Sequence, residues 1–173
     1  MAARVSVIVP TLNAEAHLPR CLTALIEGLP AGLIRELIVT DGGSTDRTRA
    51  IADEAGAVWC AGPASRGGQL ARGCAAARGE WLLILHADTV LAPGWSAVVA
   101  DHIAGSDMPG FFRLAFNATG LAPAWVAGWA NLRARLFALP YGDQGLLLRA
   151  SDYARAGGYP DQPLMEEDKG KNT

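Results

Sequence analysis

Four short polar segments of this 173-residue chain contain residue types suited to a phosphorylated ligand. Each segment directly follows an apolar run, and they are residues 10–15, 41–46, 62–69 and 86–88. Carboxylates can accept hydrogen bonds or ligate a cation, glycines let a ligand approach the backbone, and an arginine can bind phosphate. The sequence has neither a GxGxxG dinucleotide fingerprint nor a P-loop. The chemistry must therefore be read from the individual residues.

Asp41 stands before two glycines, at the end of an expected strand. A carboxylate there can accept hydrogen bonds from a base or a ribose, and Gly42 and Gly43 would leave room for that ligand. The same carboxylate could instead accept hydrogen bonds from the amides of its own turn, as Asp often does. The sequence leaves both roles open.

His86 and Asp88 follow the apolar run 81–85. Hard cations such as Mg²⁺ and Mn²⁺ prefer carboxylate oxygen, so Asp88 could hold a cation that bridges a diphosphate. Such a cation would stabilise the charge on a departing diphosphate. The alternatives are an Asp that caps the next loop or helix and a structural, hydrogen-bonded His.

Two further charged sites each have a plain alternative. Arg66 lies just before Gly67 and Gly68, where a helix is expected to begin. A guanidinium and a helix N-terminus could together bind a phosphate there, or Arg66 could be a solvated loop residue. Near the end of the chain, residues 166–168 form an acidic run that could also be a solvated tail.

The elements that must position these residues follow from apolar periodicity. Strands are expected at 5–9, 36–40, 57–61, 80–85, 110–117 and 145–149. Helices are expected at 14–27, from Ser44 or Thr45 to 56, from 67 or 68 to 78, from Pro93 to 105 and at 123–139, with a short final helix capped by Ser151. This alternation predicts one α/β domain with a Rossmann-like, mainly parallel sheet flanked by helices. Ligands bind such sheets beyond the carboxyl ends of the strands, so the polar segments should converge at one edge.

The composition narrows the class of protein. A content of 50% hydrophobic and 18% charged residues excludes an intrinsically disordered chain. The net charge of -2 gives no general attraction to nucleic acid or to an anionic membrane. Cys21, Cys60 and Cys74 are too widely spaced for a zinc site or a disulfide framework, so reduced thiols in a cytoplasmic protein are expected. No apolar stretch is long enough to predict a transmembrane helix.

Several motifs together resemble the family 2 glycosyltransferases, which have the GT-A fold. They are Val-Ser-Val-Ile-Val-Pro-Thr-Leu-Asn at 5–13, Asp-Gly-Gly-Ser-Thr-Asp at 41–46 and Leu-His-Ala-Asp-Thr at 85–89. The last motif, Gly-Asp-Gln at 142–144 and Pro-Leu-Met-Glu at 163–166 are similar to a bacterial subgroup with His-Ala-Asp in place of Asp-x-Asp. The resemblance implies a nucleotide-sugar-binding glycosyltransferase domain at 1–168 that is C-terminally incomplete, and a disordered tail at 169–173 is expected.

The resemblance also implies an activity: inverting transfer of a sugar from a nucleotide-diphosphate donor, with a UDP-sugar favoured, assisted by Mg²⁺ or Mn²⁺. Residues that match donor-binding positions are Pro10, Thr11, Glu15, Asp41, Arg66, Gln69 and His86. Asp88 matches the metal ligand, and Gly142, Asp143 and Gln144 match the acceptor side. Glu167 occupies the expected position of the general base, with Asp168 one place later and Glu166 completing the acidic group. Such a base would take the proton of the attacking acceptor hydroxyl.

Two functions stay open at this point. The chain is either a metal-assisted inverting glycosyltransferase or a nucleotide-sugar-binding domain without turnover, because its C-terminal catalytic part is missing. A donor panel with manganese, scored for binding and for release of nucleoside diphosphate, separates the two.

One apolar stripe raises the question of partners. Within residues 121–139, five residues fall on one helix face: Trp125, Trp129, Leu132, Leu136 and Leu139. The stripe could pack on the sheet, form a homodimer contact or make a peripheral membrane contact. The last fits the resemblance, because family members often act on lipid-linked acceptors. Self-association, as a dimer ahead of liposome binding, is the expectation.

Overall fold

The computed structural model describes residues 4–112 and 145–159, apart from the side chain of Arg66. Within these residues, one sheet has the strand order β3-β2-β1-β4-β6-β5. Its strands are β1 (Val5–Thr11), β2 (Ile34–Asp41), β3 (Val58–Ala61), β4 (Trp81–Ile84), β5 (Gly110–Phe111) and β6 (Leu146–Arg149). Strands β1 to β4 run parallel to one another, and β6 runs antiparallel to its neighbours β4 and β5. The predicted mainly parallel α/β sheet is confirmed.

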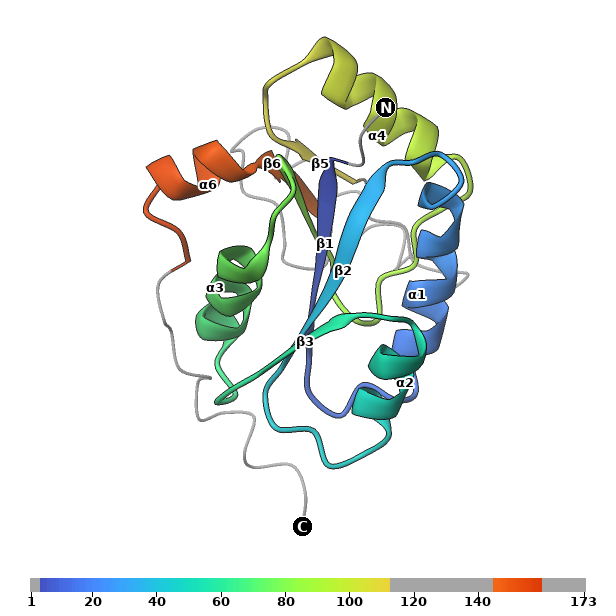
Figure 1. The fold of residues 1–173 in the computed structure, drawn as a ribbon, viewed down its shortest axis with the longest axis vertical. Coiled ribbons are helices and arrows are strands. Elements are labelled where there is room, and N and C mark those ends of the chain that lie inside the picture. The colour runs from blue at the N-terminus through green and yellow to red at the C-terminus, as the bar shows by residue number, and fades with distance from the viewer. Residues whose placement is uncertain (1–3, 113–144, 160–173) are drawn as a thin grey trace, which may run out of the picture.

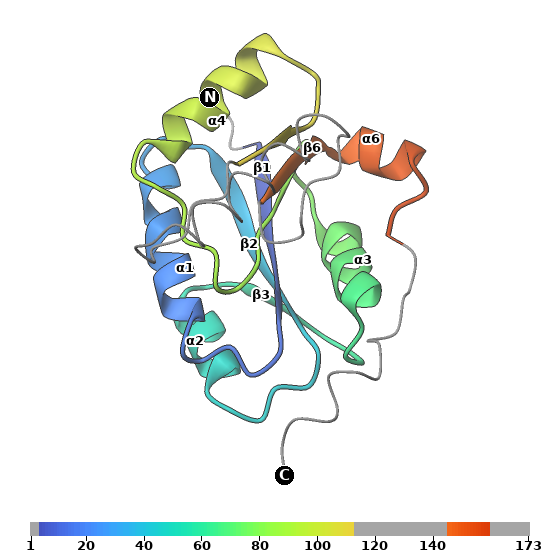
Figure 2. The same cartoon turned by 180° about the vertical axis from the view of Figure 1, so that it is seen from behind.

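Helices cover both faces of this sheet (Figures 1 and 2). They are α1 (Leu18–Leu25), continued by the 3-10 turn η1 (Ile26–Gly28), then α2 (Thr48–Glu54), α3 (Arg66–Ala76), α4 (Trp95–Gly105) and α6 (Ala150–Arg155). Helices α1 and α4 pack on one face, with α2 beside α1, and helices α3 and α6 pack on the other. None of the helices in the described part of the chain is long and apolar enough to cross a bilayer.

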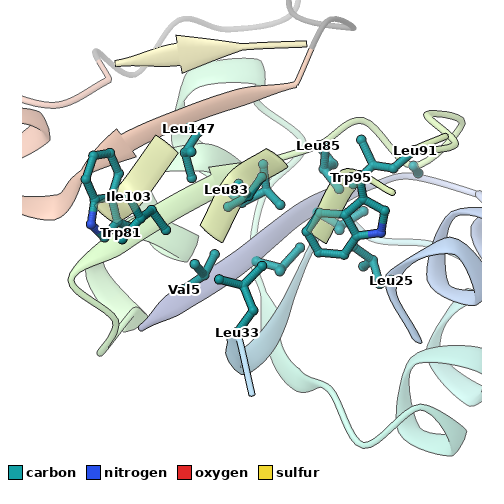
Figure 3. Close-up of a cluster of buried hydrophobic side chains, with 14 of the residues drawn as sticks. Val5, Leu25, Leu33, Trp81, Leu83, Leu85, Leu91, Trp95, Ile103 and Leu147 are labelled. Atoms are coloured by element: carbon teal, nitrogen blue, oxygen red, sulfur yellow. The ribbon is translucent and has the colours of Figure 1, made fainter. Parts of the chain in front are cut away.

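Alternating side chains of the central strands explain this layering. Val5, Val7 and Val9 of β1 point toward α1 and α4, where they pack with apolar side chains of β4 and with Trp95 (Figure 3). Ile8 points the other way, toward α3. Because both faces of β1 are buried, the strand reads as a continuous apolar run rather than as an alternating one.

Four expected helix starts are wrong by two residues or more. The helix expected at 14–27 begins at Leu18, after a turn that includes the hydrogen bond from the His17 amide to the Ala14 carbonyl. Helix α2 begins at Thr48 rather than after Ser44 or Thr45, because the Asp46 side chain is the group that accepts from the Thr48 amide, at 3.0 Å.

The final helix was expected to begin with a Ser151 cap, but Ser151 lies inside α6. Its N-cap is Arg149, without a side-chain cap hydrogen bond. The helix expected to open at Pro93 begins at Trp95, with Gly94 at the N-cap in the left-handed region. Of the strand expected at 110–117, residues from 113 onward lie outside the described residues, as does the helix expected at 123–139.

The strand order creates a switch point beside β1. The chain adds β2 and β3 on one side of β1 and then places β4 on its other side. The segments that follow β1, β2 and β4 therefore leave neighbouring strands at the same end of the sheet, the lower end in Figure 1. This is the position at which open α/β sheets bind ligands.

All three cysteines are free thiols, as expected from their spacing. Cys21 and Cys74 are buried, and Cys60 is partly buried on β3.

Candidate functional site

Thr11 and Asp41 bring the ends of β1 and β2 together at the centre of the site. They are partners in the parallel register, and the Thr11 hydroxyl donates to Asp41 Oδ1 at 3.0 Å. Both are almost fully buried. The amides of Gly43 and Ser44 each donate to Asp41 Oδ2 at 2.7 Å, and the Ser44 hydroxyl donates to Oδ1. The turn role of Asp41 is therefore present in the structure, and its contact with a base stays a prediction.

The environment of Asp41 keeps its carboxylate charged. Burial would raise its pKa, but hydrogen bonds from Ser44, Gly43 and Thr11 outweigh the burial and lower the pKa below its ordinary value. The turn thus contains a fixed negative charge with its hydrogen bonds directed inward. Gly43 has a φ of 103° and open space where a side chain would stand, so the backbone is approachable there.

Glu15 joins the loop after β1 to the loop after β2. Its amide donates to Asp46 Oδ2 at 3.0 Å, and its own Oε2 accepts from the Arg47 amide at 3.0 Å. Burial would raise the pKa of Asp46, but hydrogen bonds from Thr48 and from the Glu15 amide lower it. The predicted nucleotide contact Glu15 thus also fixes the relative position of the two loops. Pro10, the other predicted contact on β1, is partly buried beside Thr40.

Gln69, on α3, lies under the same edge and is buried. Its Nε2 donates to the carbonyls of Thr11 and Thr40 at 2.8 and 2.9 Å, and its Oε1 accepts from the Ser65 amide at 3.3 Å. The side chain therefore ties β1, β2 and the start of α3 together. Its predicted donor contact stays a prediction. Arg66 is the first residue of α3, after the Ser65 cap that accepts from the Gly68 amide.

Arg72 is a residue of this edge that the motifs did not indicate. Its Nη2 donates to the carbonyls of Asp41 and Pro63, at 3.3 and 3.1 Å. Gly62 makes room for it, because a Cβ there would lie 2.5 Å from the Arg72 Cζ. The available signal was its spacing, three residues after Gln69 on the same helix face.

His86 and Asp88 lie after β4 and contact each other. His86 Nδ1 and Asp88 Oδ1 are 2.8 Å apart, and both side chains are about half exposed. The Cys21 thiol lies beneath them, 3.7 Å from the His86 carbonyl. Burial, with a smaller contribution from the Asp88 charge, raises the pKa of Cys21 to about 12, so it is a neutral thiol.

This pair fits a cation that is shared with a ligand. Among the described residues, no three His, Cys, Asp or Glu side chains gather as a metal site. Magnesium, however, is commonly bound through one or two carboxylates together with substrate phosphates. An exposed carboxylate such as Asp88, held by an imidazole, is suitable for that arrangement.

The remaining predicted residues lie outside the described residues. They are the acceptor-side residues Gly142, Asp143 and Gln144, the acidic group Glu166, Glu167 and Asp168, and the apolar stripe within 121–139.

A family sequence model matches more than half of the chain. Residues 6–117 match the sequence model described as Glycosyl transferase family 2. A TPR repeat-containing protein of Synechococcus elongatus is 41% identical over 94 residues, which make up 51% of this chain and 21% of that protein. The chain thus spans about a fifth of the length of that curated relative.

Solved structures share the fold. Staphylococcus aureus TarS 1-349 in complex with UDP-GlcNAc superposes with a TM-score of 0.68 and 18% identity, covering 90% of this chain and 48% of that one. Mycobacterium tuberculosis glucosyl-3-phosphoglycerate synthase, in complex with Mn²⁺, UDP and phosphoglyceric acid, gives 0.60 and 21%, covering 86% and 56%. The chain spans about half the length of each. The GT-A fold expected from the sequence is confirmed.

Proposed function

The chain belongs to glycosyl transferase family 2, and on this premise we propose that it binds a nucleotide-diphosphate sugar and transfers the sugar to an acceptor hydroxyl. One observation carries the proposal: the segments after β1, β2 and β4 leave adjacent strands at one edge of the sheet. Thr11 and Asp41 are the last residues of β1 and β2, and Asp88 stands in the segment after β4. The transfer inverts the anomeric carbon, in one displacement by the acceptor.

On the donor side, the turn fixed by Asp41 borders the nucleotide. Gly43 offers an unobstructed backbone there, and Pro10, Thr11 and Glu15 line the neighbouring loop. Arg66, the first residue of α3, binds the diphosphate in this proposal, and the buried Gln69 supports the donor site by holding the carbonyls of Thr11 and Thr40. UDP is the favoured nucleotide, because TarS and the mycobacterial synthase were each solved with a uridine nucleotide.

Asp88 is the proposed protein ligand of Mg²⁺ or Mn²⁺, which supplies Lewis-acid stabilisation of the departing diphosphate when bound. His86 orients the Asp88 carboxylate through the 2.8 Å contact. The Mn²⁺ and UDP in the mycobacterial synthase support this assignment. At the acceptor, Glu167 or Asp168 of the acidic group takes the proton from the attacking hydroxyl.

One observation favours a second candidate function. The chain spans about half the length of the two solved structures, and the second candidate supposes that the residues completing the acceptor site lie outside it. In that case the domain binds the nucleotide sugar without turnover.

A donor panel with and without Mn²⁺ tests both candidates. Thermal shift reports binding of UDP and of UDP-sugars, and a coupled assay reports release of nucleoside diphosphate. Stabilisation with release supports the transferase, and stabilisation without release supports the binding domain. If no nucleotide raises the unfolding temperature, both candidates fail.

The partners belong to the same proposal. A lipid-linked acceptor, a homodimer contact and a peripheral membrane contact of a cytoplasmic protein all depend on the stripe within 121–139. Sedimentation at high concentration and flotation with anionic liposomes test them, and a monomer that ignores liposomes would remove the dimer and membrane contacts.

A further inference from the structure

Two loops of the candidate site are joined by a set of hydrogen bonds that we call the loop clasp. It connects residues 13–15, after β1, with residues 44–48, after β2. Besides the two contacts of Glu15, the Ala14 amide donates to Thr48 Oγ1 at 2.8 Å and the Asn13 amide donates to Ser44 Oγ at 2.8 Å. The Thr45 amide donates to Asn13 Oδ1 at 2.9 Å. The bonds run in both directions, so each loop is held by the other.

Asn13 has an unusual backbone conformation. Over residues 4–112 and 145–159, it is the one non-glycine residue with a positive φ, at 50°. Asn tolerates this left-handed region better than most residues, but the conformation still carries strain. Hydrogen bonds made in that conformation, from its amide and to its side-chain oxygen, offset the strain. Asn13 is also exposed, so burial does not explain its position.

Ser44 connects the clasp to the Asp41 turn. The Ser44 hydroxyl accepts from the Asn13 amide and donates to Asp41 Oδ1, while the Ser44 amide donates to Asp41 Oδ2. A shift of Asn13 would therefore move Ser44, and with it the turn that contains Gly43. The connection runs through one side chain, from the exposed loop to the buried carboxylate.

We propose that Asn13 is a positioning residue, which holds the two loops in their binding geometry before a nucleotide arrives. Loops that are ordered in advance lose less conformational freedom on binding, so affinity is higher than for the same contacts made by mobile loops. This inference rests on the proposed function, because it needs a nucleotide at this edge. It adds that an exposed residue sets that affinity by holding the loops.

Asn13→Gly is the sharpest variant. Glycine adopts the positive φ without strain and removes only the side-chain oxygen that accepts from the Thr45 amide and, at 3.4 Å, from the Thr45 hydroxyl. Without nucleotide, hydrogen exchange at the amides of Ser44 and Thr45 should become faster. The affinity for UDP should fall by roughly fivefold to tenfold, the cost of about one hydrogen bond. Asn13→Asp keeps an acceptor oxygen and should restore slow exchange at Thr45.

Glu27→Ala is the matched control. The Glu27 carboxylate accepts from the amides of Gly94 and Ser96 at the start of α4, at the opposite end of the molecule (Figure 1). Its loss should lower the unfolding temperature without changing the affinity for UDP. A general loss of stability would therefore affect both variants, whereas a positioning role affects UDP binding in Asn13→Gly alone.

The results test the positioning role of Asn13 separately from the proposed binding of a nucleotide. Unchanged exchange at Thr45, or an unchanged affinity for UDP in Asn13→Gly, would overturn the positioning role of Asn13. An equal loss of affinity in Glu27→Ala would also overturn it. If the wild-type chain does not bind UDP but Asn13→Gly exchanges faster, the proposed function fails, and the clasp stands only as a structural device.

Discussion

The two ends of the parallel sheet both use a carboxylate to accept hydrogen bonds, but backbone encloses the glycine beside Glu36, whereas the glycine beside Asp41 is open. At the N-terminal end, Glu36 Oε1 accepts from the Ser6 hydroxyl and the Arg78 amide, each at 2.6 Å. A Cβ on the neighbouring Gly79 would lie 2.7 Å from the Arg4 carbonyl. At the C-terminal end, Asp41 holds its turn in a similar way, yet Gly43 faces open space.

The two glycines differ in why they are required. Around Glu36, the glycine is required because backbone closes over it, so the network completes the turn between α3 and β4. Around Asp41, the glycine is required by its φ of 103° and the space above it stays open. The positive φ of Asn13 also belongs to this second end. Neither feature marks a site by itself, because Gly94 beside the Glu27 carboxylate also has a positive φ and open space. What distinguishes the Asp41 turn is its place at the carboxyl ends of adjacent parallel strands, where such sheets bind ligands.

The largest effect is expected from Asp88→Asn, which removes the charge proposed to hold the cation. The Mn²⁺-dependent part of the affinity for UDP should disappear, while the unfolding temperature changes little because the side chain is about half exposed. Isothermal titration with and without Mn²⁺ measures this. Glu36→Gln, at the other end, is the control and should leave the effect of Mn²⁺ intact. If Mn²⁺ raised the affinity of Asp88→Asn for UDP as much as it raises that of the wild type, the assignment of Asp88 as the metal ligand would be contradicted.

Asp41→Ala should have the next largest effect, because it removes the charged acceptor at the centre of the turn. Hydrogen bonds to a charged group contribute about 1.5–3 kcal/mol, so the affinity for UDP should fall roughly 10- to 150-fold. The same change should lower the free energy of unfolding, since the carboxylate is buried. A loss of affinity below about twofold, with stability reduced, would leave Asp41 with only its turn role.

A pair of glycine substitutions compares the two ends directly. Gly79→Ala forces a Cβ against backbone and should cost about 1–3 kcal/mol of stability, as overpacking does, with no change in the affinity for UDP. Gly43→Ala meets no neighbour but strains a positive φ, at about 1–2 kcal/mol, and should weaken UDP binding. Chemical denaturation and titration measure the two quantities. The contrast between the ends would collapse if both variants bound UDP equally well.

At the C-terminal end of the parallel strands, the sequence predicted which residues lie together better than it predicted their hydrogen bonds. Apolar runs and the strand–helix alternation were enough to place Thr11, Asp41 and Asp88 at one edge, because parallel strands end together. The direction of a polar side chain depends on packing, which the sequence pattern does not contain. The sequence did not predict that the Gln69 amide donates to two strand carbonyls, and the donor contact that the resemblance implies for Gln69 stays a prediction. Arg72 was missed for the same reason.

The predicted N-cap of α2 was wrong for a related reason. Ser44, Thr45 and Asp46 are all suitable N-cap types, so the choice among them depends on tertiary partners. Ser44 is used by Asp41 and Asn13, and the N-cap of α2 is Arg47, while Asp46 accepts from the amide of Thr48, the first residue of the helix. The clasp that makes this choice joins residues about thirty positions apart, beyond the reach of local pattern.

The smallest expected effect is a dependence of stability on acid pH, to which both the site and the α4 cap contribute. The pKa values of Asp41, Asp46 and Glu27 are lowered in the folded chain. For Glu27 the main cause is the hydrogen bond from the Ser96 side chain. A lowered folded pKa means that the unfolded chain binds more protons in acid. The contribution of these groups is therefore complete above their ordinary values of 3.8 and 4.5 and is lost as the pH falls below them.

The unfolding temperature of the wild-type chain should accordingly fall between about pH 5 and pH 3. In Asp41→Ala the fall should be shallower, because one of the three carboxylates no longer titrates. The fall should be shallower in Glu27→Ala as well, although the Glu27 carboxylate lies at the other end of the molecule. Scanning calorimetry from pH 7 to pH 3 compares the three proteins. Parallel curves for all of them would show that these hydrogen bonds do not lower the pKa values, and that the inward-directed charge of the Asp41 turn is not a stabilising feature.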